Sequence, residues 1–242
     1  MPQNVFIGDV ANYYDATSEL YFAPAVLEPT VDFLSDLAGS GKALEFAIGT
    51  GRVALPLRAR GVDVHGIEIA EDMAAQLRAK PGGAGVPVTI GDMASTRLDE
   101  SFALVYLVFN TISNLLTQAE QVACFRNAAA HLDPAGCFVV ELQIPQLRRM
   151  PPGESVYPFS VTDEHLGFDT YDFAEQRLTS HHYWLAGDHA HRFDSHHRYA
   201  WPAELDLMAE LAGMRLRERW ADWARSPFTG ESHDHVSVWE KP

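Results

Sequence analysis

The sequence predicts an α/β protein in which helices cover a doubly wound, mostly parallel sheet. Two observations support this. Short apolar segments alternate with helical ones along the first 143 residues, and turns rich in glycine and proline separate them. Two more strand-like segments, residues 214–220 and 236–240, are expected to close the sheet as an antiparallel pair and bring it to seven strands.

The five parallel strands are expected where short apolar runs are bounded by turns. They are residues 43–47, 62–67, 86–90, 104–109 and 137–142. The helices are expected where apolar residues recur at helical spacing or where helix-start and helix-stop residues occur. They are residues 12–38, 52–60, 70–79, 118–131 and 202–213.

The alternation stops after Gln143. Four prolines predict an irregular connection there: Pro145, Pro151, Pro152 and Pro158. Three segments with strand character follow at residues 168–173, 177–185 and 191–201, with a hairpin turn expected at Asp188. We therefore expect an antiparallel β insertion after strand five, placed as a lid over the carboxyl ends of the parallel strands, where such sheets bind ligands.

Composition excludes several classes of protein. The 242 residues are 47% hydrophobic and 21% charged, which is typical of an ordered globular chain. The net charge of −15 disfavours nucleic acid and anionic membranes as partners. Only Cys124 and Cys137 are present, and the start lacks the pattern of a signal peptide, so a cytoplasmic location is expected.

A glycine-rich turn carries the chemistry. Glu45 lies on the first strand, and Gly49-Thr50-Gly51 follows it and opens a helix. Glycines let the backbone approach a ligand closely, and a helix start offers free N–H groups. This pattern predicts a ligand site at the end of the first strand.

Further polar residues follow the next strands. Glu68 ends the second strand, about twenty residues past the glycine turn, where a carboxylate can accept hydrogen bonds from both hydroxyls of a ribose. Asp92 and Met93 follow the third strand and are suited to an adenine amino group and ring. Phe109 and Asn110 end the fourth strand beside the same position. Together these residues predict an adenosine-containing cofactor.

With these motifs the chain resembles the class I S-adenosylmethionine-dependent methyltransferase superfamily, and within it the small-molecule N- and O-methyltransferases. The resemblance rests on residues 43–51, 66–68, 91–93 and 134–136 and covers roughly residues 40–143. It implies a Rossmann-like core, S-adenosylmethionine as cofactor and S-adenosylhomocysteine as product. The expected reaction is an in-line displacement that moves the methyl group to a small-molecule nitrogen or oxygen.

The resemblance also implies residue roles. Glu68 would hold the ribose and Asp92 the adenine, while Gly49 and Gly51 would line the methionine portion and Glu45 would order the turn. Tyr14, in an aromatic N-terminal segment, would close over the cofactor. The full set of expected cofactor contacts is Tyr14, Glu45, Ala47, Gly49, Gly51, Arg52, Glu68, Ile69, Asp92, Met93, Phe109 and Asn110.

Two positions depart from the family pattern. Ala47 stands where a glycine is usual in the first motif, and Ala135 replaces the middle glycine of the turn before strand five. We expect both alanines to have an ordinary negative φ angle, with the methyl group of Ala47 narrowing the cofactor pocket slightly.

The catalytic residues are left open, because methyl transfer from a sulfonium does not require a strong base. His182 and His197, in the histidine-rich insertion, are the candidates if a base removes a proton from the acceptor. Strand alternation places His182 on one face with Ser180 and Trp184. We expect no metal, since no acid or cysteine completes a site around the histidines. Trp184 and the C-terminal aromatics could line an acceptor pocket or pack in the core.

The chain is expected to have four parts. These are an N-terminal helical cap (1–40), the cofactor-binding core (41–143), the insertion or lid (144–201), and a C-terminal helix and strand pair that completes the core (202–242). A homodimer through the insertion is possible on this view. The alternatives are a non-catalytic cofactor-binding scaffold on the same fold and an NAD-dependent oxidoreductase, although Ala54 occupies the third glycine site that the latter uses.

Overall fold

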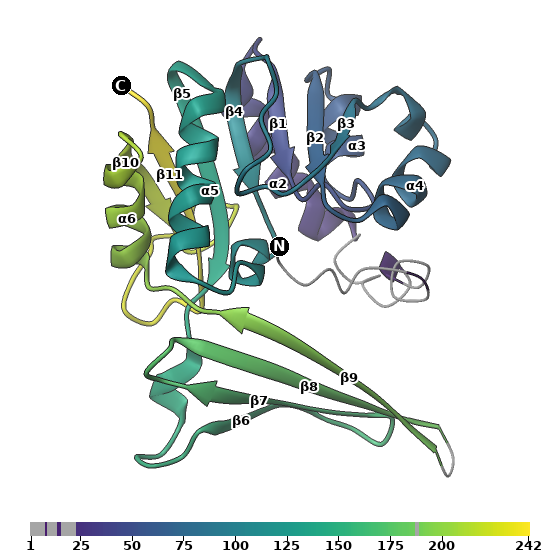
Figure 1. Cartoon of the computed structure of the whole chain (residues 1–242), viewed down its shortest axis with the longest axis vertical. Helices are drawn as coiled ribbons and strands as arrows, with labels where there is room; N and C mark the ends of the chain where they lie inside the picture. The colour runs from purple at the N-terminus through teal and green to yellow at the C-terminus, as the bar shows by residue number, and fades with distance from the viewer. Residues whose placement is uncertain (1–7, 9–13, 16–22, 187–188) are drawn as a thin grey trace.

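The computed structural model describes residues 8, 14–15, 23–186 and 189–242. They form a seven-stranded sheet with helices on both faces and a separate four-stranded sheet on one side of it (Figure 1). The helix expected over residues 12–38 begins at Pro24, and most of its expected first part lies outside the described residues, as does the turn expected at Asp188.

The seven-stranded sheet has the order β10-β11-β5-β4-β1-β2-β3. Strands β1 to β5 run parallel, β11 is antiparallel to β5, and β10 is antiparallel to β11. The predicted fold class, including the closing antiparallel pair, is confirmed. The strands are β1 (Ala43–Phe46), β2 (Val64–Glu68), β3 (Val88–Ile90), β4 (Phe102–Leu107), β5 (Leu132–Gln143), β10 (Arg215–Trp220) and β11 (Asp234–Glu240).

Helices cover both faces of this sheet, and the side chains of β1 show how. Leu44 and Phe46 pack in the core under α5 and α6, whereas Ala43 packs in the core under α2 and α3. Glu45 shares the face of Ala43, so its carboxylate is buried beside the glycine turn. The helices are α2 (Pro24–Ala38), α3 (Ala54–Ala59), α4 (Glu71–Ala79), α5 (Gln118–His131) and α6 (Pro202–Leu211), and the short 3-10 helices are η2 (Gly83–Gly85), η3 (Thr111–Asn114) and η4 (Gln146–Arg149).

The insertion after β5 is an antiparallel sheet of four strands in the order β6-β7-β8-β9. The strands are β6 (Val156–Val161), β7 (His165–Asp172), β8 (Arg177–Ala186) and β9 (His189–Arg198). The sequence did not predict β6, because Pro158 lies within it. β6 is an edge strand that pairs only with β7, and its register shifts just after Pro158, which is the setting in which a sheet tolerates proline.

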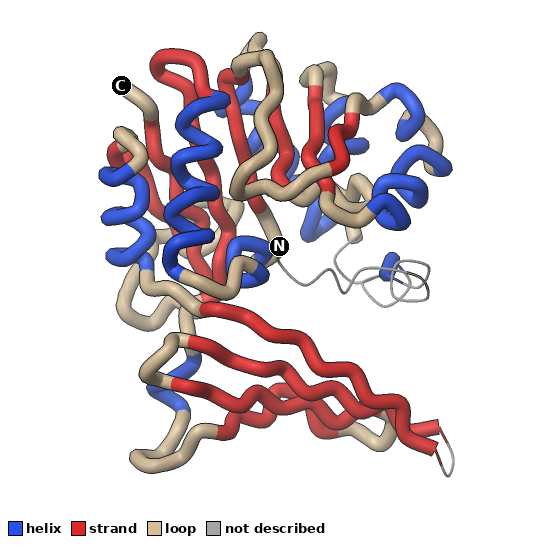
Figure 2. The backbone as a smooth tube through the Cα atoms, viewed as in Figure 1, coloured by secondary structure: helices blue, strands red, loops and turns tan. Residues whose placement is uncertain are grey.

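The insertion lies at the carboxyl ends of β4 and β5 (Figures 1 and 2). β9 contacts η3, which follows β4. A buried polar network joins the two sheets there. The guanidinium of Arg198 donates to Gln121 Oε1 at 2.6 Å and to Glu204 Oε1 at 2.7 Å, and Gln121 Nε2 donates to the carbonyls of Ile112 and Leu115.

None of the helices in the described part of the chain is long and apolar enough to cross a membrane.

Candidate cofactor and acceptor site

Glu68 is the best-defined acidic group at the edge of the parallel sheet. Its side chain is buried at the end of β2, where Oε2 accepts a hydrogen bond from Gly49 N at 2.7 Å and Oε1 accepts one from Ala70 N at 2.8 Å. Burial raises the pKa of this carboxyl, whereas the hydrogen bonds from the backbone N–H groups lower it, and the net shift is upward. The carboxylate is therefore held in a fixed orientation between the glycine turn and the start of α4.

Glu45 lies one strand away and is fully enclosed. Its Oε2 accepts a hydrogen bond from Tyr106 Oη at 2.9 Å across the pair β1–β4. Burial raises the pKa of Glu45 to about 8, although Tyr106 and the nearby Arg52 oppose this. Glu45 is therefore a buried, hydrogen-bonded acid on β1, four residues before Gly49.

The glycine turn has left-handed backbone at several positions. Gly49 has φ 55° and Gly51 has φ 78°. A Cβ atom at Gly51 would lie 2.2 Å from Leu77 Cδ1, so only glycine fits between the turn and α4, whereas a Cβ at Gly49 would meet nothing closer than Met73 Cε at 3.5 Å. Glycine at position 51 thus avoids a clash with Leu77, and glycine at both positions avoids the strain that a side chain has at these φ angles.

Ala47 contradicts the expectation of an ordinary φ angle. Its φ is 52°, and Ala135, the other alanine at a family glycine position, has φ 63°. The chain keeps the left-handed backbone that glycine would supply and places a Cβ on it, which costs about 1–2 kcal/mol at each position. The prediction was wrong because the hydrogen bonds around the turn, such as Ile48 N to Ile67 O, fix the path of the backbone whatever the side chain.

The described part of the N-terminal segment lies against this turn. Asp15 Oδ1 accepts a hydrogen bond from Thr50 Oγ1 at 2.6 Å, and Lys80 pairs with Asp15 and donates to the carbonyl of Thr50. Tyr14 packs with Ile69 beside the start of α4. Burial raises the pKa of the Tyr14 hydroxyl, and the charges of Arg52 and Asp15 also act on it. The structure thus brings Tyr14 to the glycine turn and Glu68.

The residues after β3 are held by α5. Asp92 Oδ1 accepts a hydrogen bond from Ala94 N at 2.8 Å, and Met93 packs in the core with only 8% of its surface exposed. Asn127 Nδ2 donates to the carbonyls of Met93 and Thr96, at 2.7 and 3.0 Å. His131 Nε2 accepts a hydrogen bond from the N–H of the same loop at residue 98. The loop that carries Asp92 is therefore bound to α5 at several points.

Phe109 and Asn110, after β4, both have left-handed backbone, with φ 59° and 60°. Two bonds to β5 stabilise this pair: Phe109 N donates to Glu141 Oε2 at 2.7 Å, and Gln143 N donates to Asn110 Oδ1 at 2.6 Å. Arg52 lies 5.0 Å from the centre of the Phe109 ring, as a cation over an aromatic face. The end of β4 is thereby joined to the glycine turn and to β5.

Two residues of this arrangement were missed in the sequence. The Glu141 carboxylate bridges Phe109 N and Trp223 Nε1, and Asn127 holds the loop after β3. A lone glutamate in the apolar strand β5 was the available signal for Glu141. Asn127 gave none, because its partners are 31 and 34 residues away.

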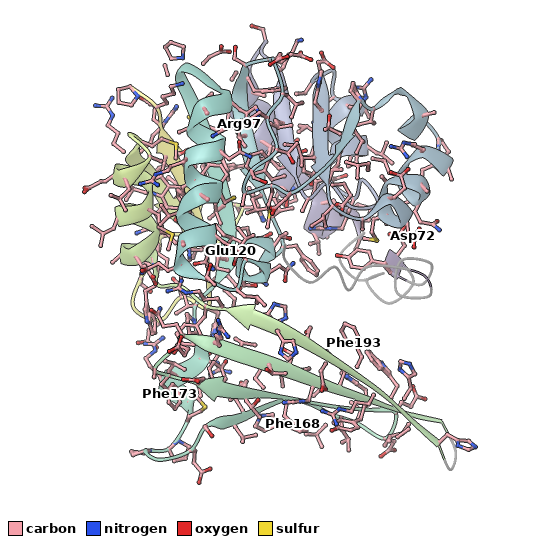
Figure 3. The ribbon with its side chains drawn as sticks, in the orientation of Figure 1. Asp72, Arg97, Glu120, Phe168, Phe173 and Phe193 are labelled. Atoms are coloured by element: carbon pink, nitrogen blue, oxygen red, sulfur yellow. The ribbon has the colours of Figure 1, made fainter. Side chains whose placement is uncertain are left out.

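The insertion turns one face toward the parallel sheet. Successive cross-strand rows of the insertion alternate between its two faces. The inner face is the one that carries the row of His197, and the outer face is the one that carries the row of Phe168. The inner face carries Asp169, Tyr171, Leu178, Ser180, His182, Trp184, His165, His191, Phe193, Ser195 and His197. Figure 3 shows Phe193 on the side of the parallel sheet and Phe168 on the opposite side. The expected pairing of His182 with Ser180 and Trp184 on one face is found.

His197 and His182 differ in position. His197 Nδ1 lies 3.1 Å from Asn114 Oδ1, in η3, and its Nε2 lies 2.9 Å from Ser195 Oγ. His182 contacts only side chains of the insertion among the described residues, with Trp184 stacked 5.2 Å away. Burial lowers the pKa of both rings, that of His197 to about 4. His197 is therefore a neutral side chain at the junction of the two sheets.

Comparison with known proteins identifies this arrangement. Residues 43–136 match the family model described as a methyltransferase domain. The CcbJ methyltransferase from Streptomyces caelestis has a structure of TM-score 0.80 to this one, with 38% sequence identity over 88% of each chain. The cypemycin N-terminal methyltransferase of a Streptomyces species is 25% identical over 94% of each chain. The dTDP-3-amino-3,6-dideoxy-alpha-D-glucopyranose N,N-dimethyltransferase of Streptomyces fradiae is 32% identical over 58% of this chain and 55% of its own.

This chain is a class I S-adenosylmethionine-dependent methyltransferase.

The predicted enzyme class and cofactor are thereby confirmed, and the oxidoreductase and the non-catalytic scaffold are set aside. Within the described residues the methyltransferase has no group of three or more histidine, cysteine, aspartate or glutamate side chains placed to hold a metal ion.

Proposed function

We propose that this methyltransferase transfers a methyl group from S-adenosylmethionine to the amine nitrogen of a small molecule. The names of two relatives support nitrogen over oxygen or carbon, because one methylates a peptide N-terminus and the other dimethylates an amino sugar. The net charge of −15 also favours an acceptor that is cationic when free in solution.

The orientation of Glu68 carries the proposal for the cofactor. Both of its oxygens are fixed by backbone N–H groups at the end of β2, which leaves the remaining lone pairs for the two ribose hydroxyls. Asp92 takes the adenine amino group, and Tyr14 covers the turn. The other proposed contacts are Glu45, Ala47, Gly49, Gly51, Arg52, Ile69, Met93, Phe109 and Asn110.

The cofactor supplies a methyl group on a positively charged sulfur, so its leaving group is a neutral thioether. The residues of the enzyme then have to align the nitrogen with that methyl group and exclude water. Phe109 and Asn110 are suited to this task, because their left-handed backbone is held by Glu141 and by the N–H of Gln143. The insertion serves as the lid on the acceptor side.

We further propose that neither His182 nor His197 removes a proton from the acceptor before transfer. The lowered pKa of His197, about 4, and the lowered pKa of His182 make both rings poor proton acceptors at neutral pH. The acceptor amine therefore enters in its neutral form, and His197 positions η3 through Asn114.

Calorimetry tests the cofactor site. We expect Glu68→Ala to weaken S-adenosylmethionine binding at least tenfold, and Glu68→Gln, which keeps one acceptor oxygen, to have an intermediate effect. Glu71→Ala, an exposed neighbour paired with Arg78, is the matched control and should bind normally. Normal binding by a folded Glu68→Ala protein would refute this assignment.

The pH dependence of turnover tests the acceptor. With a set of amines of different basicity, we expect the rise of kcat/KM with pH to follow the pKa of each amine, and His197→Asn to leave that dependence unchanged. A rise at one fixed pH for all amines, lost in His197→Asn, would identify His197 as the base instead.

The predicted homodimer would use the outer face, where Leu166 and Leu185 are 39% and 37% exposed. Light scattering of the purified protein measures the oligomeric state directly.

A further inference from the structure

The inner face of the insertion carries little formal charge. Its only carboxylate is Asp169, and none of the inner-face positions in the described residues carries a lysine or arginine. Arg192 lies on the outer face, where it pairs with Asp194. The guanidinium of Arg198 donates hydrogen bonds to Glu204 and Gln121 at the junction of the two sheets. The inner face therefore offers an anionic or neutral surface to an acceptor.

The guanidinium of Arg149 lies at the β6 edge of the inner face. Arg149 donates to Tyr157 Oη at 3.2 Å and lies 3.2 Å from His233 Nε2. Tyr157 is the cross-strand neighbour of Asp169, so this part of the inner face carries a carboxylate as well as a neighbouring guanidinium. Asp169 accepts a hydrogen bond from Ser180 at 2.6 Å, and burial raises its pKa.

The start of α5 carries a carboxylate. α5 begins at the junction with the insertion, and a helix N-terminus would otherwise be a site for phosphate. Thr117 and Glu120 form a complete capping box there, in which the Glu120 carboxylate accepts from Thr117 N at 2.9 Å. Figure 3 shows Glu120 at the end of α5 that faces the insertion. A phosphate at this helix start would therefore lie beside a carboxylate.

Aromatic side chains occupy the far part of the inner face. The rings of His165, His182 and Trp184 are nearly parallel, with centroids 5.0 to 5.2 Å apart, and Phe193 adjoins His182. Trp184 is 39% exposed. The row of Trp184 and His191 lies six residues along β9 from His197, which is about 20 Å. The surface is therefore long and aromatic beyond its first rows, with Trp184 and Phe193 as its apolar members.

We propose that the acceptor is a phosphate-free amine whose non-reacting part is an apolar ring system lying on the inner face against Trp184, His182 and Phe193. This rests on the proposed N-methylation and specifies its substrate class. It separates this enzyme from the relative that acts on a dTDP-linked sugar. A diphosphate brought onto this face would meet the Asp169 carboxylate, and the described cross-strand rows of the inner face carry no lysine or arginine to pair with the diphosphate, whereas an aromatic group gains contact with the exposed rings.

The test compares two acceptors that share one amine. The probes are a 3-amino sugar linked to thymidine diphosphate and the nitrophenyl glycoside of the same amino sugar. We expect kcat/KM for the nitrophenyl glycoside to exceed that for the nucleotide by at least tenfold. Trp184→Ala should remove most of this preference by raising KM, with kcat unchanged. Leu185→Ala, a neighbour of similar exposure on the outer face, should leave the preference intact.

The proposal would be overturned if the wild-type enzyme had an equal or higher kcat/KM for the nucleotide. It would also be overturned if Trp184→Ala and Leu185→Ala changed the preference equally. If neither glycoside is methylated, the proposed function fails for these amines, and calorimetry on the protein loaded with S-adenosylhomocysteine decides the inference separately. Tighter binding of the nitrophenyl glycoside that depends on Trp184 supports it. Equal affinity for both probes, or an affinity difference that Trp184→Ala leaves unchanged, refutes it.

Discussion

Arg198 and Glu204 form an ion pair of 2.7 Å where the two sheets meet, with only 5% and 16% of their side chains exposed. Arg198 ends β9 and Glu204 lies in the first turn of α6. Since Arg198 also donates to Gln121, which in turn holds the carbonyls of Ile112 and Leu115, this pair fixes the insertion to the loop after β4.

Removal of Arg198 should therefore destabilise the protein. We expect Arg198→Ala to lower the free energy of unfolding by about 3 kcal/mol, because Glu204 and Gln121 lose a buried charged partner. Urea denaturation followed by circular dichroism measures this. Arg192→Ala, which removes a surface pair with Asp194, is the control and should leave the midpoint in place. A loss for Arg198→Ala no larger than for the control would contradict the role of the pair.

The strained Ala47 predicts a stabilising substitution. Ala47→Gly should raise the free energy of unfolding by about 0.5–1 kcal/mol, since relief of the left-handed strain exceeds the added entropy of glycine in the unfolded chain. Ala135→Gly should give a similar gain, because its φ of 63° is equally strained. Only Ala47→Gly should also tighten S-adenosylmethionine binding, because Ala47 is a proposed cofactor contact and Ala135 is not. Loss of stability in both variants would show that the left-handed backbone is not strained.

Glu45 predicts a dependence of stability on pH. Its pKa rises from the ordinary 4.5 to about 8 in the fold, so the folded state keeps a proton that the unfolded state releases. Its contribution is therefore complete below pH 4.5 and is lost as pH rises toward 8, by at most about 5 kcal/mol. Glu45→Gln, which still accepts from Tyr106, should flatten this part of the profile in thermal or urea unfolding. An unchanged slope in the variant would assign the dependence to other groups.

Asn127 predicts an effect on the cofactor without contact to it. Asn127→Ala removes two buried hydrogen bonds to the loop that carries Asp92, at Met93 and Thr96. We expect KM for S-adenosylmethionine to rise about tenfold while kcat at saturation is retained. The exposed neighbour variant Arg126→Ala should behave like the wild type. A fall in kcat with unchanged KM would place the effect on the chemistry instead of on the loop.

Much of the fold could be predicted because its signals are local. The bounds of α5 were expected from its sequence, and Glu68 and Asp92 stand out as polar residues directly after strands. Residues whose roles depend on distant partners could not be predicted in this way. Gln121 and Arg198 are 77 residues apart, and Glu141 acquires its role only because β4 and β5 lie side by side.

Two errors have the same origin. In the sequence, Pro158 argues against a strand, although an edge strand has one side without ladder bonds. Ala47 was given an ordinary φ because alanine prefers one, although the surrounding backbone bonds dictate the angle. In both cases the tertiary arrangement overrides the preference of a single residue.

The connectivity of the insertion has an evolutionary consequence. The chain leaves the seven-stranded sheet once, after β5, and returns once, at α6, and the intervening strands pair only among themselves in the described residues. Such a unit can be recombined between relatives as one cassette without breaking a ladder of the parent sheet. The exchange has one requirement: the incoming cassette has to bring an arginine to the place of Arg198, or the recipient has to replace Gln121 and Glu204, which would otherwise be left buried without their partner.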